Sequence, residues 1–271
     1  MICTRLNTFR WLLVTGLTAL NSVQAAPPAI AIIIDDLGYR YAEGQRAATL
    51  PGRVACAVIP NTPHGTPMAE MAHARGKEVL LHLPMQSLDP ERPVGNEGIA
   101  LNTTRVGVTE ALRNGIRSIP HVAGVNNHMG SLITRHPGHM TWLMKDLQQN
   151  NLFFVDSVTT ASSVALSMAR EQGVRATQRD IFIDSEEATE SQIIQRLETL
   201  YALARRQGQA LGIAHPYPAT MTVLERELPR LAQHGLRLVT VQELIGLREN
   251  AAKENADLAS AKLDSSSFAA P

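Results

Sequence analysis

Short apolar runs alternate with helical patterns along most of this 271-residue chain. The runs predict strands at 29–35, 53–59, 78–83, 123–129, 152–156, 180–184, 210–214 and 236–240. The segments between them predict helices near 65–76, 107–118, 137–149, 160–172, 188–207 and 220–234. Strands that alternate with helices are typical of a parallel sheet, and this many repeats favour an α/β barrel over an open, doubly wound sheet. No Gly-x-Gly-x-x-Gly motif follows the first run, so nothing in the sequence supports dinucleotide binding.

The two ends of the chain differ in composition from this alternating region. In residues 1–25, Arg5 and Arg10 precede an apolar stretch at 11–20, and small residues follow it. This is the layout of a cleaved secretory signal peptide. The apolar stretch is shorter than the ~20 residues of a membrane span, although an uncleaved N-terminal anchor stays an alternative. Residues 249–271 are small, polar and unpatterned, and they predict a disordered tail. We therefore expect one domain, 26–248, in the periplasm or outside the cell, with no membrane span after cleavage.

Charge and cysteine content narrow the range of functions. Without residues 1–25, 23 basic residues stand against 25 acidic ones, so the net charge is about −2 and nothing indicates a nucleic-acid partner. Cys56 is the only cysteine outside the first 25 residues, which excludes an internal disulfide in the domain. Burial of a hydrophobic core must stabilise the fold, and a domain of this size is large enough to form one.

Two adjacent carboxylates, Asp35 and Asp36, close the first apolar run. In α/β folds the carboxyl ends of the strands carry the chemistry. A pair of carboxylates there binds a metal, divides acid and base roles, or caps the next helix. Because successive side chains of a strand point to opposite faces, both can serve one site only if the backbone bends at this point. Gly38, just beyond the pair, favours such a bend.

Other residues with metal-binding or acid–base chemistry close later predicted strands. They are His82, His128, Asp156, Asp184 and His215. One carboxylate with two imidazoles is typical of Zn²⁺ with an open position for water, whereas Mg²⁺ and Ca²⁺ prefer oxygen ligands. The absence of a His-Glu-x-x-His helix and of a Gly-x-Ser-x-Gly elbow disfavours a zincin-type peptidase and a serine hydrolase of the α/β type.

Five segments around these residues resemble the divergent polysaccharide deacetylase family, an exported bacterial branch of the carbohydrate esterase superfamily with the NodB-type fold. The segments are Ile34-Asp35-Asp36-Leu37-Gly38-Tyr39, Leu81-His82-Leu83-Pro84-Met85, Val125-Asn126-Asn127-His128-Met129-Gly130-Ser131, Phe154-Val155-Asp156-Ser157 and His215-Pro216. The resemblance covers about residues 29–245. It implies a distorted (β/α)₇ barrel in a single α/β domain and a divalent metal, most often Zn²⁺.

The resemblance also implies a role for each strand-end residue. Asp35 matches the catalytic base, and Asp36 matches the metal-binding aspartate. His82 matches the first histidine ligand, and His215 matches the histidine that acts as general acid. The second histidine that the superfamily carries soon after the first is absent here, and we expect His128 to replace it as a metal ligand.

Four further residues are expected to bind substrate or to support the site: Asn127, Asp156, Ser157 and His64. Asp156 either orients His215 or holds a sugar hydroxyl. His64 follows the second predicted strand and either lines the same barrel mouth or belongs to a turn. The segment that contains Asn127 stands where the superfamily has an arginine–proline motif that orients the base.

The resemblance implies a metal-dependent hydrolase that removes N- or O-acetyl groups from a cell-envelope polysaccharide through a metal-activated water. The absent arginine motif and the relocated histidine leave an alternative, a non-catalytic metal- and glycan-binding barrel with partners in cell-wall remodelling. A different metallohydrolase, such as an amidase or a phosphoesterase, has weaker support. A phosphoesterase needs several cations at the site, and Arg179 is one candidate.

Overall fold

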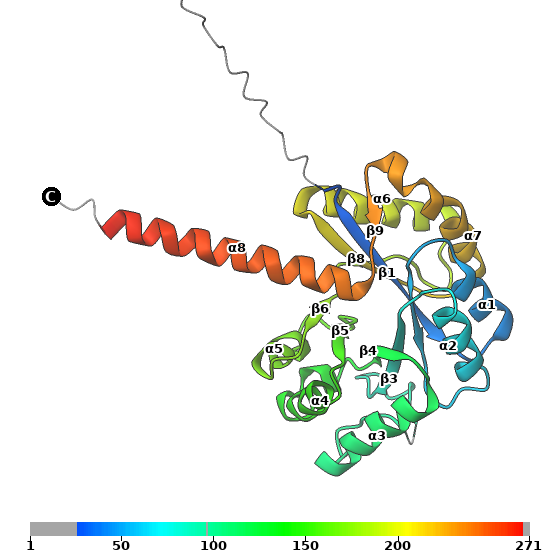
Figure 1. Cartoon of the computed structure of the whole chain (residues 1–271). Helices are drawn as coiled ribbons and strands as arrows, with labels where there is room; N and C mark the ends of the chain where they lie inside the picture. Colours follow the sequence, from blue (N-terminus) through cyan, green and yellow to red (C-terminus); the bar gives the residue numbers. More distant parts are fainter. Residues whose placement is uncertain (1–25, 96, 268–271) are drawn as a thin grey trace, which may run out of the picture.

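The computed structural model describes residues 26–95 and 97–267 as a parallel sheet curled into a partial barrel, with helices packed around it (Figure 1). The strand order is β6-β5-β4-β3-β2-β1-β8-β7, and β9 pairs with β1. The strands are β1 (Ala29–Leu37), β2 (Ala55–Val58), β3 (Val79–Met85), β4 (Val122–Met129), β5 (Phe153–Asp156), β6 (Ala176–Gln178), β7 (Ile181–Phe182), β8 (Gln209–Ala214) and β9 (Arg237–Leu238). The predicted α/β class and the NodB-like distorted barrel are confirmed.

The barrel is open between β6 and β7. The sequence predicts a strand at 180–184, which overlaps β7, and does not predict β6. β6 pairs with β5, whereas β7 pairs with β8. Side chains of the two residues between them replace part of the missing strand pairing. The Asp180 carboxylate accepts the backbone N–H of Leu211 at 2.7 Å. The Arg179 guanidinium donates to the carbonyls of Ser157 and Val158, each at 2.8 Å.

The helices surround the sheet: all but the last pack against its outer face, and the last packs its first turns against the inner face. They are α1 (Tyr41–Thr49), α2 (Gly65–His73), α3 (Arg105–Ser118), α4 (Pro137–Gln149), α5 (Ala165–Glu171), α6 (Glu190–Gln207), α7 (Pro218–Glu227) and α8 (Val241–Ser267), with 3₁₀ turns at Ile133–Arg135 and Leu228–His234. The sequence does not predict α1, because its buried face consists of Gly44, Ala47 and Ala48 rather than large apolar residues.

Strand β1 contributes side chains to two hydrophobic clusters, one on each face of the sheet. Its residues from Ala29 to Ile34 are fully buried. Because strand side chains alternate, Ile30, Ile32 and Ile34 pack into the cluster shared with the helices, whereas the residues between them join a smaller cluster. Leu244 and Ile245 of α8 belong to that smaller cluster. The apolar packing around β1 leaves polar side chains to gather at its carboxyl end.

The chain ends differ in part from the expectations. The predicted signal peptide, residues 1–25, lies outside the described residues. From residue 249, where a disordered tail is predicted, α8 continues to Ser267 and projects away from the barrel (Figure 1). Alanine, the strongest helix former, is the commonest residue of this segment, with five of its 19 positions. Among the described helices, none combines the length and the apolar character that a membrane crossing requires.

Candidate metal centre

The chain bends at Asp35 and Asp36, as strand alternation predicts for two carboxylates that share one site. Asp36 has a left-handed backbone with φ of 58°, and the pairing of β1 with β2 changes register here. Gly38 follows with φ of 121°, and a Cβ atom at this position would overlap the Thr62 side chain. Asp35 is buried, whereas the Asp36 side chain keeps 34% of its surface exposed.

Three side chains from three strands converge beyond this bend: Asp36 of β1, His82 of β3 and His128 of β4. Asp36 Oδ1 lies 3.1 Å from His82 Nε2 and 3.0 Å from His128 Nδ1. The two ring nitrogens lie 3.2 Å apart. One carboxylate and two imidazoles are the protein ligands of a zinc site that keeps its fourth position open.

The electrostatics of this cluster fit a bound cation. Asp36 Oδ1 is buried and has no hydrogen bond of good geometry, although two imidazole nitrogens lie close to it. Burial opposes the ionisation of Asp36, but His128 and His82 together outweigh it and hold the pKa of this carboxyl well below its usual range. An ionised oxygen without a hydrogen bond, crowded by two further electron-pair donors, is what a divalent ion would satisfy.

Asn126 connects the cluster to the second carboxylate. Its amide NH₂ donates to Asp35 Oδ1 at 2.8 Å, which turns its oxygen toward His82 Nδ1, also at 2.8 Å. His82 therefore carries its proton on Nδ1 and presents the Nε2 lone pair to the cluster. Asn126 is fully buried at the centre of β4. One neutral side chain thus orients both a metal ligand and a carboxylate.

Asp35 lies buried beside the cluster. Its Oδ2 lies 3.7 Å from His82 Nε2. Burial raises the pKa of Asp35 above its ordinary value, although the positive potential of His82 and His215 opposes the change. A carboxylate with a raised pKa is a better proton acceptor than an ordinary aspartate, because it binds the proton more tightly.

His215 stands on the other side of the cluster and is fixed by Asp184. Its Nδ1 lies 2.9 Å from Asp184 Oδ1, and its backbone N–H donates to Oδ2 of the same carboxylate. Burial lowers the pKa of His215, but the Asp184 hydrogen bond and nearby carboxylates reverse this and raise the pKa to about 9. The rings of Phe182 and Tyr217 flank the imidazole at 5.2 and 5.4 Å. His215 Nε2 is left to face Asp36, whose Oδ2 lies 3.8 Å away.

The three cluster residues, Asp35 and His215 line a solvent-open cavity of about 430 Å³ at the carboxyl ends of the strands. Asn127 and Ser157 also line it, and the side-chain Oδ1 of Asn127 accepts the Ser157 N–H at 2.9 Å. The other lining residues are Arg92, Met129, Thr159, Phe182, Ser185, Glu186, Glu187 and Tyr217. A cluster that opens on a cavity of this size has room for a water molecule and part of a substrate.

Comparison with known families agrees with this geometry. Residues 32–245 match the model of the divergent polysaccharide deacetylases. The chain belongs to the divergent polysaccharide deacetylase family. The match covers most of the barrel, from β1 into the start of α8, and includes every residue of the cluster.

One sequence relative and two solved structures illustrate the similarity. Protein YibQ of Escherichia coli K12 is 36% identical over 197 residues, which cover 73% of this chain and 61% of YibQ, so the chain spans less than two thirds of that relative. An uncharacterized protein of Agrobacterium tumefaciens C58 has a similar structure, with a TM-score of 0.78 at 23% identity over 81% of this chain and 90% of that chain. The catalytic domain of a peptidoglycan N-acetylglucosamine deacetylase from Eubacterium rectale gives a TM-score of 0.53 at 13% identity, over 81% and 90% of the two chains. The two structural likenesses show a common fold.

Two residues expected near the site make other contacts in this family member. His64 precedes α2, packs against the Tyr41 ring at 5.5 Å, and is not among the residues that line the cavity. Asp156 accepts the Val158 N–H at 2.8 Å and the Ser163 hydroxyl at 2.6 Å, so its carboxylate orders the loop after β5. Asp184, not Asp156, orients His215.

Sequence reasoning missed the supporting roles of Asp184 and Asn126, although the position of each residue in the sequence gave a signal. Asp184 closes a predicted strand, as the other site residues do, but its contact with His215 spans 31 positions. Asn126 lies in the family-like segment of β4, where its burial and its two partners become visible only in three dimensions.

Proposed function

We propose that this chain is a metal-dependent hydrolase that removes N- or O-acetyl groups from a cell-envelope polysaccharide. The observation that carries the proposal is the convergence of Asp36, His82 and His128, with Asp35 and His215 on either side, at an open cavity. We further propose Zn²⁺ as the metal, because nitrogen ligands outnumber oxygen ligands. The pattern of residues 1–25 supports export, so we place the activity in the periplasm or outside the cell.

The residues of the site divide the chemistry between them. Asp36, His82 and His128 would hold the metal, which when bound polarises a carbonyl group and acidifies water. Asp35, held by Asn126 at one oxygen, has its other oxygen available to take the proton of the attacking water. His215 is protonated at neutral pH because its pKa is raised, and it can donate the Nε2 proton to the leaving amine or alcohol.

The arginine motif of the superfamily is replaced by a different means of holding the base. Asn126 positions Asp35 with a hydrogen bond but without a positive charge. A positive charge near Asp35 comes instead from His215, which acts to lower the pKa of Asp35. This arrangement supports a proton-accepting role for Asp35 without the arginine.

The test is acetate release by the purified zinc-bound protein. We expect zinc-dependent release from chitooligosaccharides or peptidoglycan fragments, and Asp35→Asn should abolish turnover while the protein keeps its metal. If the wild-type protein binds zinc but releases no acetate from either substrate class, the hydrolase proposal fails. That result would favour the non-catalytic metal- and glycan-binding alternative.

A further inference from the structure

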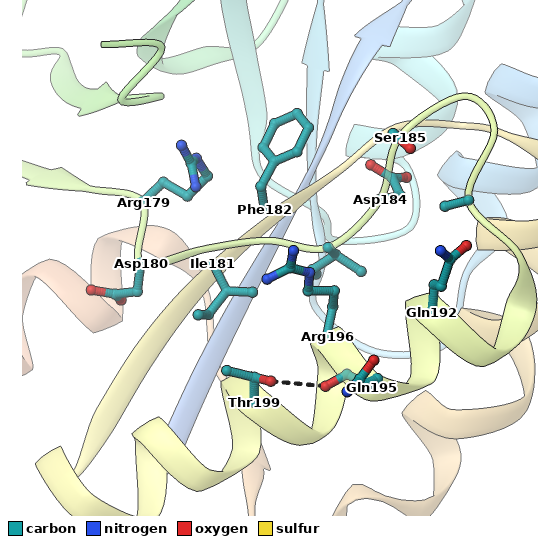
Figure 2. Close-up of a pocket in the computed structure, with 12 residues that line it drawn as sticks. Arg179, Asp180, Ile181, Phe182, Asp184, Ser185, Gln192, Gln195, Arg196 and Thr199 are labelled. Atoms are coloured by element: carbon teal, nitrogen blue, oxygen red, sulfur yellow. Dashed lines mark hydrogen bonds between the residues drawn. The ribbon is translucent and has the colours of Figure 1, made fainter. Parts of the chain in front are cut away.

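A second cavity adjoins the catalytic one. It has a volume of about 660 Å³ and lies between the segment around β7 and the N-terminal half of α6 (Figure 2). Phe182 and Ser185 line both cavities. A chain-like ligand with one unit at the metal cluster can therefore place its neighbouring unit in this second cavity.

The second cavity presents a positive charge to a ligand. Its two acidic residues are already paired, Asp180 with Arg248 and Asp184 with His215. Arg196 of α6 is exposed and makes no hydrogen bond or ion pair with any other described residue. Figure 2 shows its guanidinium extending from α6 toward β7. Because a guanidinium fork matches the geometry of a carboxylate, this is a site for a carboxylate group.

Other groups of the second cavity are suited to a sugar. Phe182 is 41% exposed, and its ring is packed between the His215 ring and the Arg179 guanidinium, whose carbon lies 4.9 Å from the ring centroid. The part of the Phe182 ring that these two groups leave exposed lies at the boundary of the two cavities and offers apolar surface to a sugar ring. The Gln192 side-chain oxygen accepts from the backbone N–H and the hydroxyl of Thr189, which leaves its NH₂ group to donate to a ligand.

We propose that the second cavity binds a carboxylate-bearing sugar, with Phe182 against the ring and Arg196 paired to the carboxylate. The inference rests on the proposed function, because it places this acidic sugar next to the acetylated one at the metal cluster. Two kinds of sugar carry such a group, a sugar with a lactyl ether and a uronic acid. The structure thus assigns the substrate to the acidic glycans.

Binding can be measured without turnover. We would titrate the zinc-bound Asp35→Asn protein with three probes: the N-acetylglucosamine–N-acetylmuramic acid disaccharide, di-N-acetylchitobiose, and a hyaluronan tetrasaccharide. At least one acidic probe should bind about fivefold more tightly than chitobiose, the size expected for one partly exposed ion pair. The preference should weaken as salt is raised. Preference for the muramyl probe would identify the lactyl ether, and preference for hyaluronan would identify the uronate.

Two arginine variants separate the site from the general charge of the helix. Arg196→Gln should remove the acidic preference while chitobiose binding stays within about twofold, since only the ion pair is lost. Arg206→Gln, an exposed position on the same helix, should keep the preference. The inference is overturned if neither acidic probe is preferred, or if both variants lower the preference equally. Neither result depends on acetate release, so failure of this inference and failure of the hydrolase proposal are distinguishable.

Discussion

Replacement of Asn126 by alanine should weaken metal binding although Asn126 is not a metal ligand. Asn126 is fully buried and bridges His82 Nδ1 and Asp35 Oδ1, each at 2.8 Å. Without it, the His82 ring loses the contact that keeps the Nε2 lone pair on the cluster. Loss of such a supporting hydrogen bond lowers metal affinity by about 10–100-fold.

The same substitution should also lower the free energy of unfolding. Two buried polar groups, on His82 and Asp35, lose their partner, and each costs about 1–3 kcal/mol when left unsatisfied. We therefore expect about 3 kcal/mol in total for the metal-free protein. Stability alone does not distinguish this role from an ordinary structural one, so a matched control is needed.

Asn127 supplies that control. It neighbours Asn126 on β4, is also buried, and makes two hydrogen bonds, to the Met129 carbonyl at 2.7 Å and from the Ser157 N–H at 2.9 Å. Asn127→Ala should lose a similar free energy of unfolding in urea, but its zinc affinity should stay within about threefold of wild type, because no metal ligand loses its partner.

The assay is competition for zinc with a chromogenic chelator, together with urea unfolding of the metal-free proteins. The reasoning is refuted if the two variants lose zinc affinity equally, or if Asn126→Ala binds zinc as tightly as wild type. In either case Asn126 would stabilise the fold without orienting His82.

Three further predictions concern His215, the bend and the metal. In the metal-free protein the His215 ring should titrate near pH 9, and Asp184→Asn should lower this pKa, as NMR of the imidazole protons would show. Because the folded pKa exceeds the unfolded value, the stabilisation lost in Asp184→Asn should be largest below about pH 6.5. The part of this loss that comes from the His215 charge should disappear as pH rises through 9, and a loss that does not change with pH would contradict this. Gly38→Ala should lower the free energy of unfolding, measured in urea, by about 2–4 kcal/mol and should weaken zinc binding. The reason is that the backbone φ at Gly38 is 121° and the Thr62 side chain occupies the place of a Cβ atom. Unchanged stability would show that the bend tolerates a side chain. Zinc at a hundredfold excess over its Kd should add about 2.7 kcal/mol to the free energy of unfolding of the wild-type protein and raise its Tm in calorimetry. The Tm of Asp36→Asn should rise much less, and equal gains in Tm would place the metal elsewhere.

Much of the site could be predicted from the sequence, because strand ends of a parallel sheet meet at one edge. The apolar run before Asp35 locates β1, and histidines after later runs fall at the same edge. Side-chain alternation predicts a bend at Asp35 and Asp36 if both carboxylates serve one site, and the positive φ of Asp36 confirms the bend. These features depend on local periodicity, which a single sequence carries.

Other features depend on contacts that local periodicity does not carry. The pairing of Asp184 with His215 joins the end of the β7 segment to the end of β8, whereas the sequence offered Asp156 as the residue that orients His215. The break between β6 and β7 depends on Asp180, whose carboxylate replaces a strand contact. Helix α1 buries only small residues, so its apolar pattern is too weak to predict it.

X-ray absorption at the zinc edge of the zinc-bound wild-type protein tests the central claim most directly. One zinc ion per chain, with two imidazole nitrogens, one carboxylate and an exchangeable oxygen in the remaining position, is the result that Asp36, His82 and His128 predict. Fewer than two imidazoles, or a fourth protein ligand that closes the site, would contradict the hydrolytic centre proposed here.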